Sequence, residues 1–167
     1  KLARLSLAVT LMVLPSSASP GAGVGRVEKE IEELAKRVRQ AIVRRDLKRL
    51  LALVPPNGMG CGETTVPLEE VKRDLSDTKS YLHARLFDSN LLRTKYADHG
   101  YTVSLLELFS RFPRAQVMVS FQEFPGQDPH AFPCAVFVPS GEEHPTMLCF
   151  FRQKDRWWLT DTFYYCI

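Results

Sequence analysis

The sequence predicts an α+β domain in which N-terminal helices pack on a curved antiparallel sheet of about four strands, a cone-like arrangement. Apolar residues recur at helical spacing in the first part of the chain and at every second position in the last part. Short connections between the predicted strands imply that neighbouring strands run antiparallel. The chain of 167 residues is long enough for one well-packed core, and we expect a single domain over residues 27–167.

A long amphipathic helix is predicted at the start of this domain. Within residues 26–54, apolar side chains recur every three or four positions and charged side chains occupy the other positions. Asp46 is expected to cap a second, shorter helix near the end of this range. The apolar stripe of the long helix consists of Val27, Ile31, Leu34, Val38 and Ile42.

A glycine-rich segment follows at residues 57–65 and is predicted to be a tight loop with positive φ at one or more glycines. It lacks the Gly-Lys-Ser/Thr ending of a phosphate-binding loop, so we exclude that function. Further helices are expected after Pro67 and from the capping box Ser104–Glu107. Residues 79–97 fit neither a helix nor a strand clearly.

The strands of the sheet are predicted from the change of period to two in the last third of the chain. Their connections contain Pro-Gly, Ser-Gly and Lys-Asp pairs, which favour turns. The predicted strands are Val117–Phe124, Phe132–Val138, Met147–Phe151 and Trp157–Tyr165.

Residues 1–22 are predicted to be a secretory signal peptide. Lys1 and Arg4 precede the apolar run Leu5–Leu14, and small residues follow it. The run has about ten residues, half of what a membrane-spanning helix needs, although an uncleaved anchor is the alternative. The mature protein is therefore expected to be secreted or periplasmic, with no stable membrane anchor after cleavage.

Cleavage is expected after Ala22, with Ala18 as the alternative, and residues 23–26 are predicted to be a flexible lead-in. Removing residues 1–22 lowers Lys+Arg from 22 to 20 against 19 Asp+Glu, and the net charge from +3 to +1. A nearly neutral mature domain lacks the basic footprint of a nucleic-acid-binding protein, so no nucleic-acid partner is expected.

The four cysteines are expected to form disulfides, because their number is even and the chain is predicted to be exported. If the hairpin turns between Gly141 and Glu142, Cys134 lies directly opposite Cys149, close enough for a bridge. The second pair would then be Cys61 with Cys166. Free buried thiols are the alternative, whereas the scattered spacing without a CxxC motif disfavours zinc or redox chemistry.

No metal or cofactor site is predicted. None of the four histidines has another histidine four positions away, which a helical metal site would need. Only His83 is expected near the core, since His99, His130 and His144 fall in predicted loops. The remaining basic residues are interpreted as solvated surface: Arg85, Arg93, Lys95, Arg111 and Arg114.

Asp161 is the most distinctive polar residue of the predicted sheet. By strand alternation it shares a face with Trp157, Leu159 and Phe163, and a carboxylate on an apolar face is costly without a partner. A structural ion pair is one interpretation. The other is a general base whose pKa is raised by burial in a ligand cavity lined by these residues.

A catalytic hypothesis would combine Asp161 with His83 or Tyr81 as its further candidate residues. The sequence contains no nucleophile elbow of the Gly-x-Ser-x-Gly type, so a hydrolase of that class is not indicated. Aromatic residues at the end of the chain are typical of strand cores as well as of ligand platforms.

Two segments resemble the nuclear-transport-factor-2-like superfamily with its cystatin-like cone fold: residues 31–58, a long helix running into an Asp-led short helix, and residues 151–161, a charged turn followed by Trp and an alternating strand. Together they cover about a quarter of the chain. The resemblance implies a curved sheet closed by helices around a cavity. Members of the superfamily include isomerases, dehydratases, polyketide cyclases and non-catalytic binding or accessory domains.

Taken with the absence of a catalytic motif, the sequence predicts an exported, non-catalytic binding or accessory domain for a small apolar ligand or a protein partner. A small cavity enzyme of the isomerase or dehydratase type, using Asp161, is one alternative. A toxin-neutralising or inhibitor protein is another.

Overall fold

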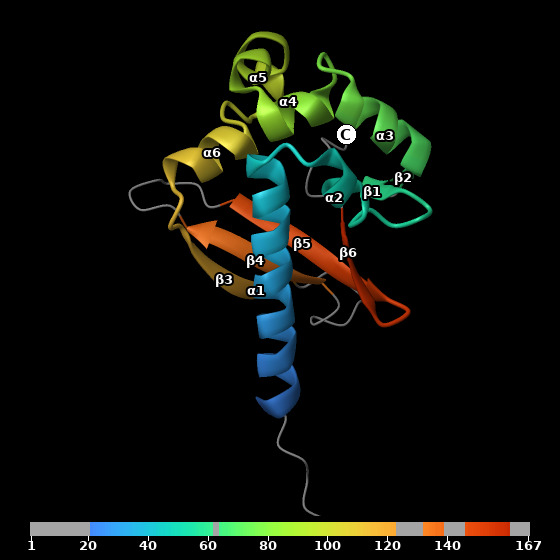
Figure 1. Ribbon diagram of the computed structural model, residues 1–167, viewed down its shortest axis with the longest axis vertical. Helices are drawn as coiled ribbons and strands as arrows, with labels where there is room; N and C mark the ends of the chain where they lie inside the picture. The colour runs from blue at the N-terminus through green and yellow to red at the C-terminus, as the bar shows by residue number, and fades with distance from the viewer. Residues whose placement is uncertain (1–20, 62–63, 123–131, 139–145, 161–167) are drawn as a thin grey trace, which may run out of the picture.

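The computed structural model describes residues 21–61, 64–122, 132–138 and 146–160. Residues 1–20, which make up most of the predicted signal peptide, lie outside the described residues. The described chain is α+β, as predicted: helices cover one face of an open, four-stranded antiparallel sheet (Figure 1).

The first helix, α1 (Gly21–Val43), crosses the sheet and buries the predicted stripe. Ile31, Val38 and Ile42 are fully buried, and Val27 packs against them at the edge of the core. The helix begins at Gly21, so residues 23–26 form part of its first turns and are not a lead-in loop. Adding residues to an existing helix costs much less than starting one, which lets a weak helix former extend a strong one.

A short second helix, α2 (Leu47–Leu51), follows as predicted. Asp46 is its N-cap, and the carboxylate accepts a hydrogen bond of 3.0 Å from the backbone N–H of Arg49. The chain reverses between the two helices at Arg45, whose φ is +52°.

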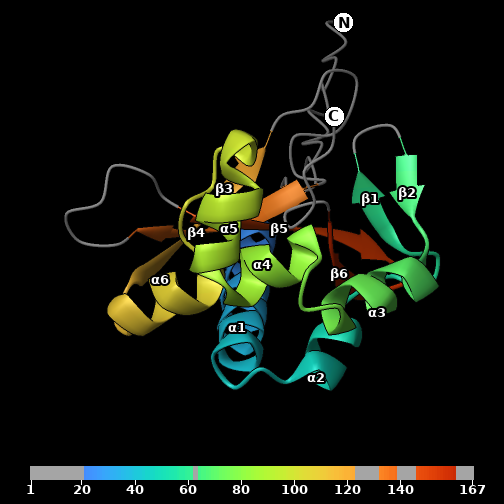
Figure 2. The ribbon, with the colours of Figure 1, turned by 90° about the horizontal axis from the view of Figure 1, so that it is seen from above.

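The glycine-rich segment is a small hairpin rather than a loop. Strands β1 (Met59–Cys61) and β2 (Thr64–Val66) pair antiparallel, with Met59 opposite Val66. Figure 2 shows this hairpin beside α3 and apart from the main sheet. Gly58 has the positive φ predicted, +111°. Strands of three residues are too short for alternation of side chains to reveal them.

The middle of the chain is helical. It contains α3 (Leu68–Ser76), α4 (Tyr81–Phe87), α5 (Ser89–Lys95), the 3₁₀ turn η1 (Ala97–His99) and α6 (Leu105–Arg111). The ambiguous residues 79–97 thus resolve into two short helices. Each begins at a side-chain cap: Ser80 accepts from the N–H of His83, and Asp88 accepts from the N–H of Leu91.

The predicted capping box at Ser104 is half formed. The Ser104 hydroxyl accepts a 3.3 Å hydrogen bond from the N–H of Glu107, as a cap should. The N–H of Ser104, however, donates to Oγ of Ser89 at 2.8 Å, while the Glu107 carboxylate pairs with Arg111. Ser89 has therefore replaced the carboxylate as the second half of the box.

The main sheet has the strand order β3-β4-β5-β6 with every neighbouring pair antiparallel. Lys154 and Asp155 form the two-residue turn between the last two strands, with φ values of +50° and +58°, the geometry of a type I′ hairpin. The described strands are β3 (Gln116–Gln122), β4 (Phe132–Val138), β5 (Thr146–Gln153) and β6 (Arg156–Leu159).

The core lies between α1 and the inner face of the sheet, where Phe137, Leu148 and Phe150 are fully buried. On the opposite face, Met118 and Met147 are 54 % and 40 % exposed. The void of about 10 Å³ among the apolar side chains of α2, α3, α4 and β6 holds at most one water molecule.

Cys134 lies directly opposite Cys149 in the β4–β5 register, and the two form a disulfide. This confirms the pairing predicted from the hairpin. The proposed partner bridge, Cys61 with Cys166, lies outside the described side chains. Within the described segments, no helix has both the length and the apolar character needed to cross a membrane.

Candidate functional site

Of the candidate catalytic residues, His83 and Tyr81 lie within the described part of the chain. Asp161 lies outside the described residues, as does Phe163. His83 and Tyr81 are both on α4, but side chains two positions apart on a helix point in different directions.

His83 and Tyr81 each have a structural environment of their own. The Nδ1 atom of His83 lies 3.0 Å from the carbonyl oxygen of Leu75, which can only accept, so this nitrogen carries the proton. The ring of Tyr81 contacts that of Tyr96 edge to face at a centroid distance of 5.3 Å, and that of His99 at a tilt at 4.7 Å. Both side chains therefore fasten α4 to neighbouring segments.

The candidate ligand-cavity residues of β6 occupy packed positions. Leu159 is 1 % exposed and borders the void of about 10 Å³, which has no room for a ligand. Trp157 is half-buried, and its indole Nε1 donates a hydrogen bond of 2.9 Å to Oε2 of Glu30. In the part of the chain that is described, β6 contributes to the core.

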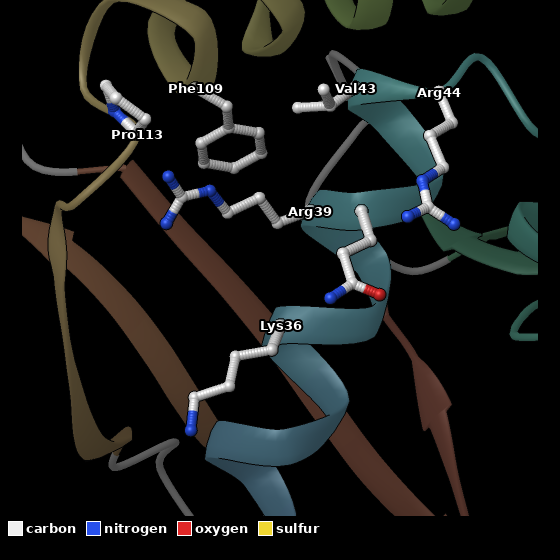
Figure 3. A pocket seen from close by; sticks show the side chains of 7 residues that line it. Lys36, Arg39, Val43, Arg44, Phe109 and Pro113 are labelled. Carbon is white, nitrogen blue, oxygen red and sulfur yellow. The ribbon is translucent and has the colours of Figure 1, made fainter.

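An open groove of about 420 Å³ lies instead between α1 and the segment around α6 (Figure 3). Its described lining comes from one stripe of α1 and from two residues of the α6 region. Residues three, four, seven and eight positions apart share a helix face, which brings the α1 members together. The lining residues are Lys36, Arg39, Gln40, Val43, Arg44, Phe109 and Pro113.

Arg39 is the best-anchored cation of this groove. Its Nη2 donates a hydrogen bond of 3.0 Å to the carbonyl oxygen of Phe112, and its guanidinium carbon lies 5.6 Å from the centre of the Phe109 ring. Partial burial lowers the pKa of Arg39 from its usual value. No carboxylate among the described residues pairs with it, so its charge is compensated only by a carbonyl and an aromatic face.

Lys36 and Arg44 border the same groove and are both exposed. Nζ of Lys36 lies 2.8 Å from Oε1 of Glu33, and this hydrogen bond raises the pKa of Lys36. The guanidinium of Arg44 has neither an ion pair nor a hydrogen bond to any described residue. Lys36, which is paired with Glu33, and Arg44 thus add exposed positive charge beside the anchored charge of Arg39.

A second open hollow of about 440 Å³ adjoins the groove at Pro113 and continues its basic character. Arg111 and Arg114 line it, together with Phe112, Pro113 and Ala115, in the segment that leads into β3. Arg111 forms an ion pair with Glu107. The described lining of the two hollows contains five cationic side chains and no carboxylate.

The sequence interpretation of the scattered cations needs one correction. Arg85, expected on the solvated surface, is only 5 % exposed and donates to the carbonyl oxygen of Val103. Arg111 and Arg114 are exposed, as predicted, and they line the hollow beside the groove. The spacing of Lys36, Arg39 and Arg44 could have predicted from the sequence that they share one helix face. The approach of α6 to that face could not have been predicted in this way.

The described residues contain no group of three or more His, Cys, Asp or Glu side chains arranged to hold a metal ion. Comparisons with known protein families, curated proteins and solved structures find no significant match to this chain.

Proposed function

We propose that this chain is an extracytoplasmic, non-catalytic binding or accessory domain that engages a protein partner through the groove between α1 and α6. The observation that carries this proposal is the contrast, among the described residues, between the interior void and the open groove. The apolar void beside β6 measures about 10 Å³, whereas the open groove measures about 420 Å³.

A protein partner fits the groove better than a small apolar ligand does. Small-molecule sites usually enclose most of the ligand surface and are lined mainly by apolar side chains. This groove is open to solvent and carries Lys36, Arg39 and Arg44 on its walls. An open basic surface gains affinity by extending contacts over a larger partner.

The disulfide between Cys134 and Cys149 supports the extracytoplasmic part of the proposal. Such bridges persist in oxidising compartments and are rare in the cytosol. We further propose kinship with the nuclear-transport-factor-2-like superfamily, which rests on the sequence resemblance described above. A long helix running into an Asp-capped short helix is common to both.

The proposal is tested by selecting peptides from a displayed random library against the intact, oxidised protein. Val43 borders the groove and is 45 % exposed, so Val43→Trp should fill part of it. Val138 is 41 % exposed on the sheet and offers a matched control, Val138→Trp. Selected peptides should lose binding to Val43→Trp and keep binding to Val138→Trp.

A second arm of the same experiment follows small apolar fragments by NMR. If fragments shift the resonances of Trp157 and Leu159 while no selected peptide depends on Val43, the ligand site is interior and the proposal is wrong.

A further inference from the structure

We infer that the segment bound in this groove is acidic, with carboxylates that meet the groove cations and an apolar side chain that meets its floor. This inference rests on the proposed function and names the chemistry of the partner. It is argued from charge, from the anchoring of Arg39 and from the apolar part of the lining.

The charge of the groove is local rather than a property of the whole chain. The net charge of the chain is only +3 at pH 7, yet the described lining of the groove and its adjoining hollow is cationic without a carboxylate. Positive side chains gathered in a concave surface focus the potential there and attract anions. Since like charges repel, such a cluster is stabilised by an acidic partner.

Arg39 is already held in a position to receive a carboxylate. The Phe112 carbonyl and the Phe109 ring fix its guanidinium, and Figure 3 shows that group beside Phe109 and Pro113. A guanidinium carries five N–H donors in a planar fork, and only one described hydrogen bond uses them. Because the side chain is already ordered, binding loses little rotamer entropy, and partial burial strengthens the charge pair.

The floor adds an apolar requirement. Val43 and Pro113 are exposed beside the cations, and the Phe109 ring lies beneath Arg39. A peptide can present a carboxylate and an apolar side chain within one short stretch. Sulfated polysaccharides and nucleic acids offer mainly charge along a backbone, and a flat bilayer surface does not reach into a concave groove. The lining therefore favours an acidic peptide segment over these other polyanions.

The test begins with the sequences of the peptides that the random library yields against the wild-type protein. We expect enrichment in Glu and Asp together with an apolar residue. Replacing Glu and Asp by Gln and Asn in a selected peptide should weaken binding by about tenfold or more. Raising the salt from about 0.1 M to about 1 M, which shortens the Debye length from about 10 Å to about 3 Å, should weaken binding as well.

Variants of the protein locate the effect. The double variant Lys36→Gln with Arg44→Gln should bind the acidic peptides about tenfold more weakly than the wild type, because two exposed charge contacts are lost. Lys72→Gln combined with Lys48→Gln is the matched control, because Lys72 pairs with Glu69 on α3 as Lys36 pairs with Glu33 on α1. The control should leave binding unchanged, and thermal unfolding should show all variants folded.

Three outcomes overturn the inference in different ways. If selected peptides depend on Val43 but are neutral and insensitive to salt, the groove binds proteins and only the acidic chemistry is wrong. If no peptide depends on Val43, the proposed function itself fails. If heparin-derived oligosaccharides or anionic vesicles bind through Lys36 and Arg44 and no acidic peptide does, the ligand is a different polyanion.

Discussion

The indole Nε1 of Trp157 donates a hydrogen bond of 2.9 Å to Oε2 of Glu30, joining residues 127 positions apart. The bond ties β6, the last described strand, to the first half of α1. Two cations flank it: Nε of Arg26 lies 2.9 Å from Oε1 of Glu30, and the guanidinium carbon of Arg152 lies 5.7 Å from the Trp157 ring centre. A hydrogen bond with charged neighbours thus joins the first half of the helix to the last hairpin.

Because of this contact, we expect the free energy of unfolding to fall as the pH is lowered. The hydrogen bond from Trp157, and next the one from Arg26, lower the pKa of Glu30 from its ordinary value near 4.5. A lowered folded pKa gives stability that is present above 4.5 and is lost as pH falls through the lower value. Glu30→Gln keeps an acceptor but does not titrate, so its unfolding free energy should fall less steeply on acidification. Urea unfolding followed by tryptophan fluorescence between neutral and acidic pH measures the difference, and parallel curves would contradict it.

The disulfide should contribute strongly to stability. It closes a sequence separation of 15 residues, for which the chain-entropy account gives about 3 kcal/mol. The double variant Cys134→Ala with Cys149→Ala should therefore unfold at lower denaturant than the oxidised wild type by roughly that free energy. Reducing the wild type with dithiothreitol should abolish most of the difference. An equal stability of the oxidised wild type and the variant would refute this contribution.

Gly58 is expected to be irreplaceable, in contrast to Gly100. Both have positive φ, +111° and +79°, but a Cβ at Gly58 would lie 2.0 Å from the carbonyl oxygen of Val66, whereas at Gly100 it meets nothing within 4 Å. Gly100→Ala should lower the free energy of unfolding by about 1–2 kcal/mol, the strain of a left-handed backbone at a residue with a Cβ atom. Gly58→Ala should cost more, because the β1–β2 hairpin has to move. Chemical denaturation of both variants checks the order, and equal losses would contradict it.

Arg85 should tolerate loss of its charge better than replacement by lysine. It is buried, its Nη1 donates to the carbonyl oxygen of Val103 at 3.1 Å, and its guanidinium carbon lies 3.8 Å from the Tyr101 ring centre. Burial lowers the pKa of Arg85. Arg85→Lys keeps a buried cation and loses the planar stacking, so it should cost about 3 kcal/mol, whereas Arg85→Met should cost about 1 kcal/mol.

Arg93 provides the control for this comparison. Its Nη1 also donates to a loop carbonyl, that of Thr102 at 3.1 Å, but the bond is exposed. Arg93→Met should change the free energy of unfolding by no more than about 0.5 kcal/mol. If Arg85→Met proved more destabilising than Arg85→Lys, the charge of Arg85 would be needed for folding.

The sequence alone predicted the features that depend on neighbours within a few residues or on strand alternation. The stripe of α1, the caps at Asp46 and Ser104, and the pairing of Cys134 with Cys149 belong to this group. Helix periodicity, capping and hairpin register depend on the spacing of residues close together in the sequence, so each can be predicted without knowing the rest of the fold. The β1–β2 hairpin was not predicted, because strands of three residues are too short to show an alternation of apolar and polar side chains.

Only the tertiary structure decided where the side chains that matter for binding meet. Arg39 and Phe112 are 73 positions apart, and the approach of α6 to α1 converts separate basic residues into one groove. The same long-range packing buries Arg85 and fills the space beside Leu159. Local spacing determined which face of each helix and strand is apolar, but the contacts between distant elements determined which polar residues remain exposed beside one another.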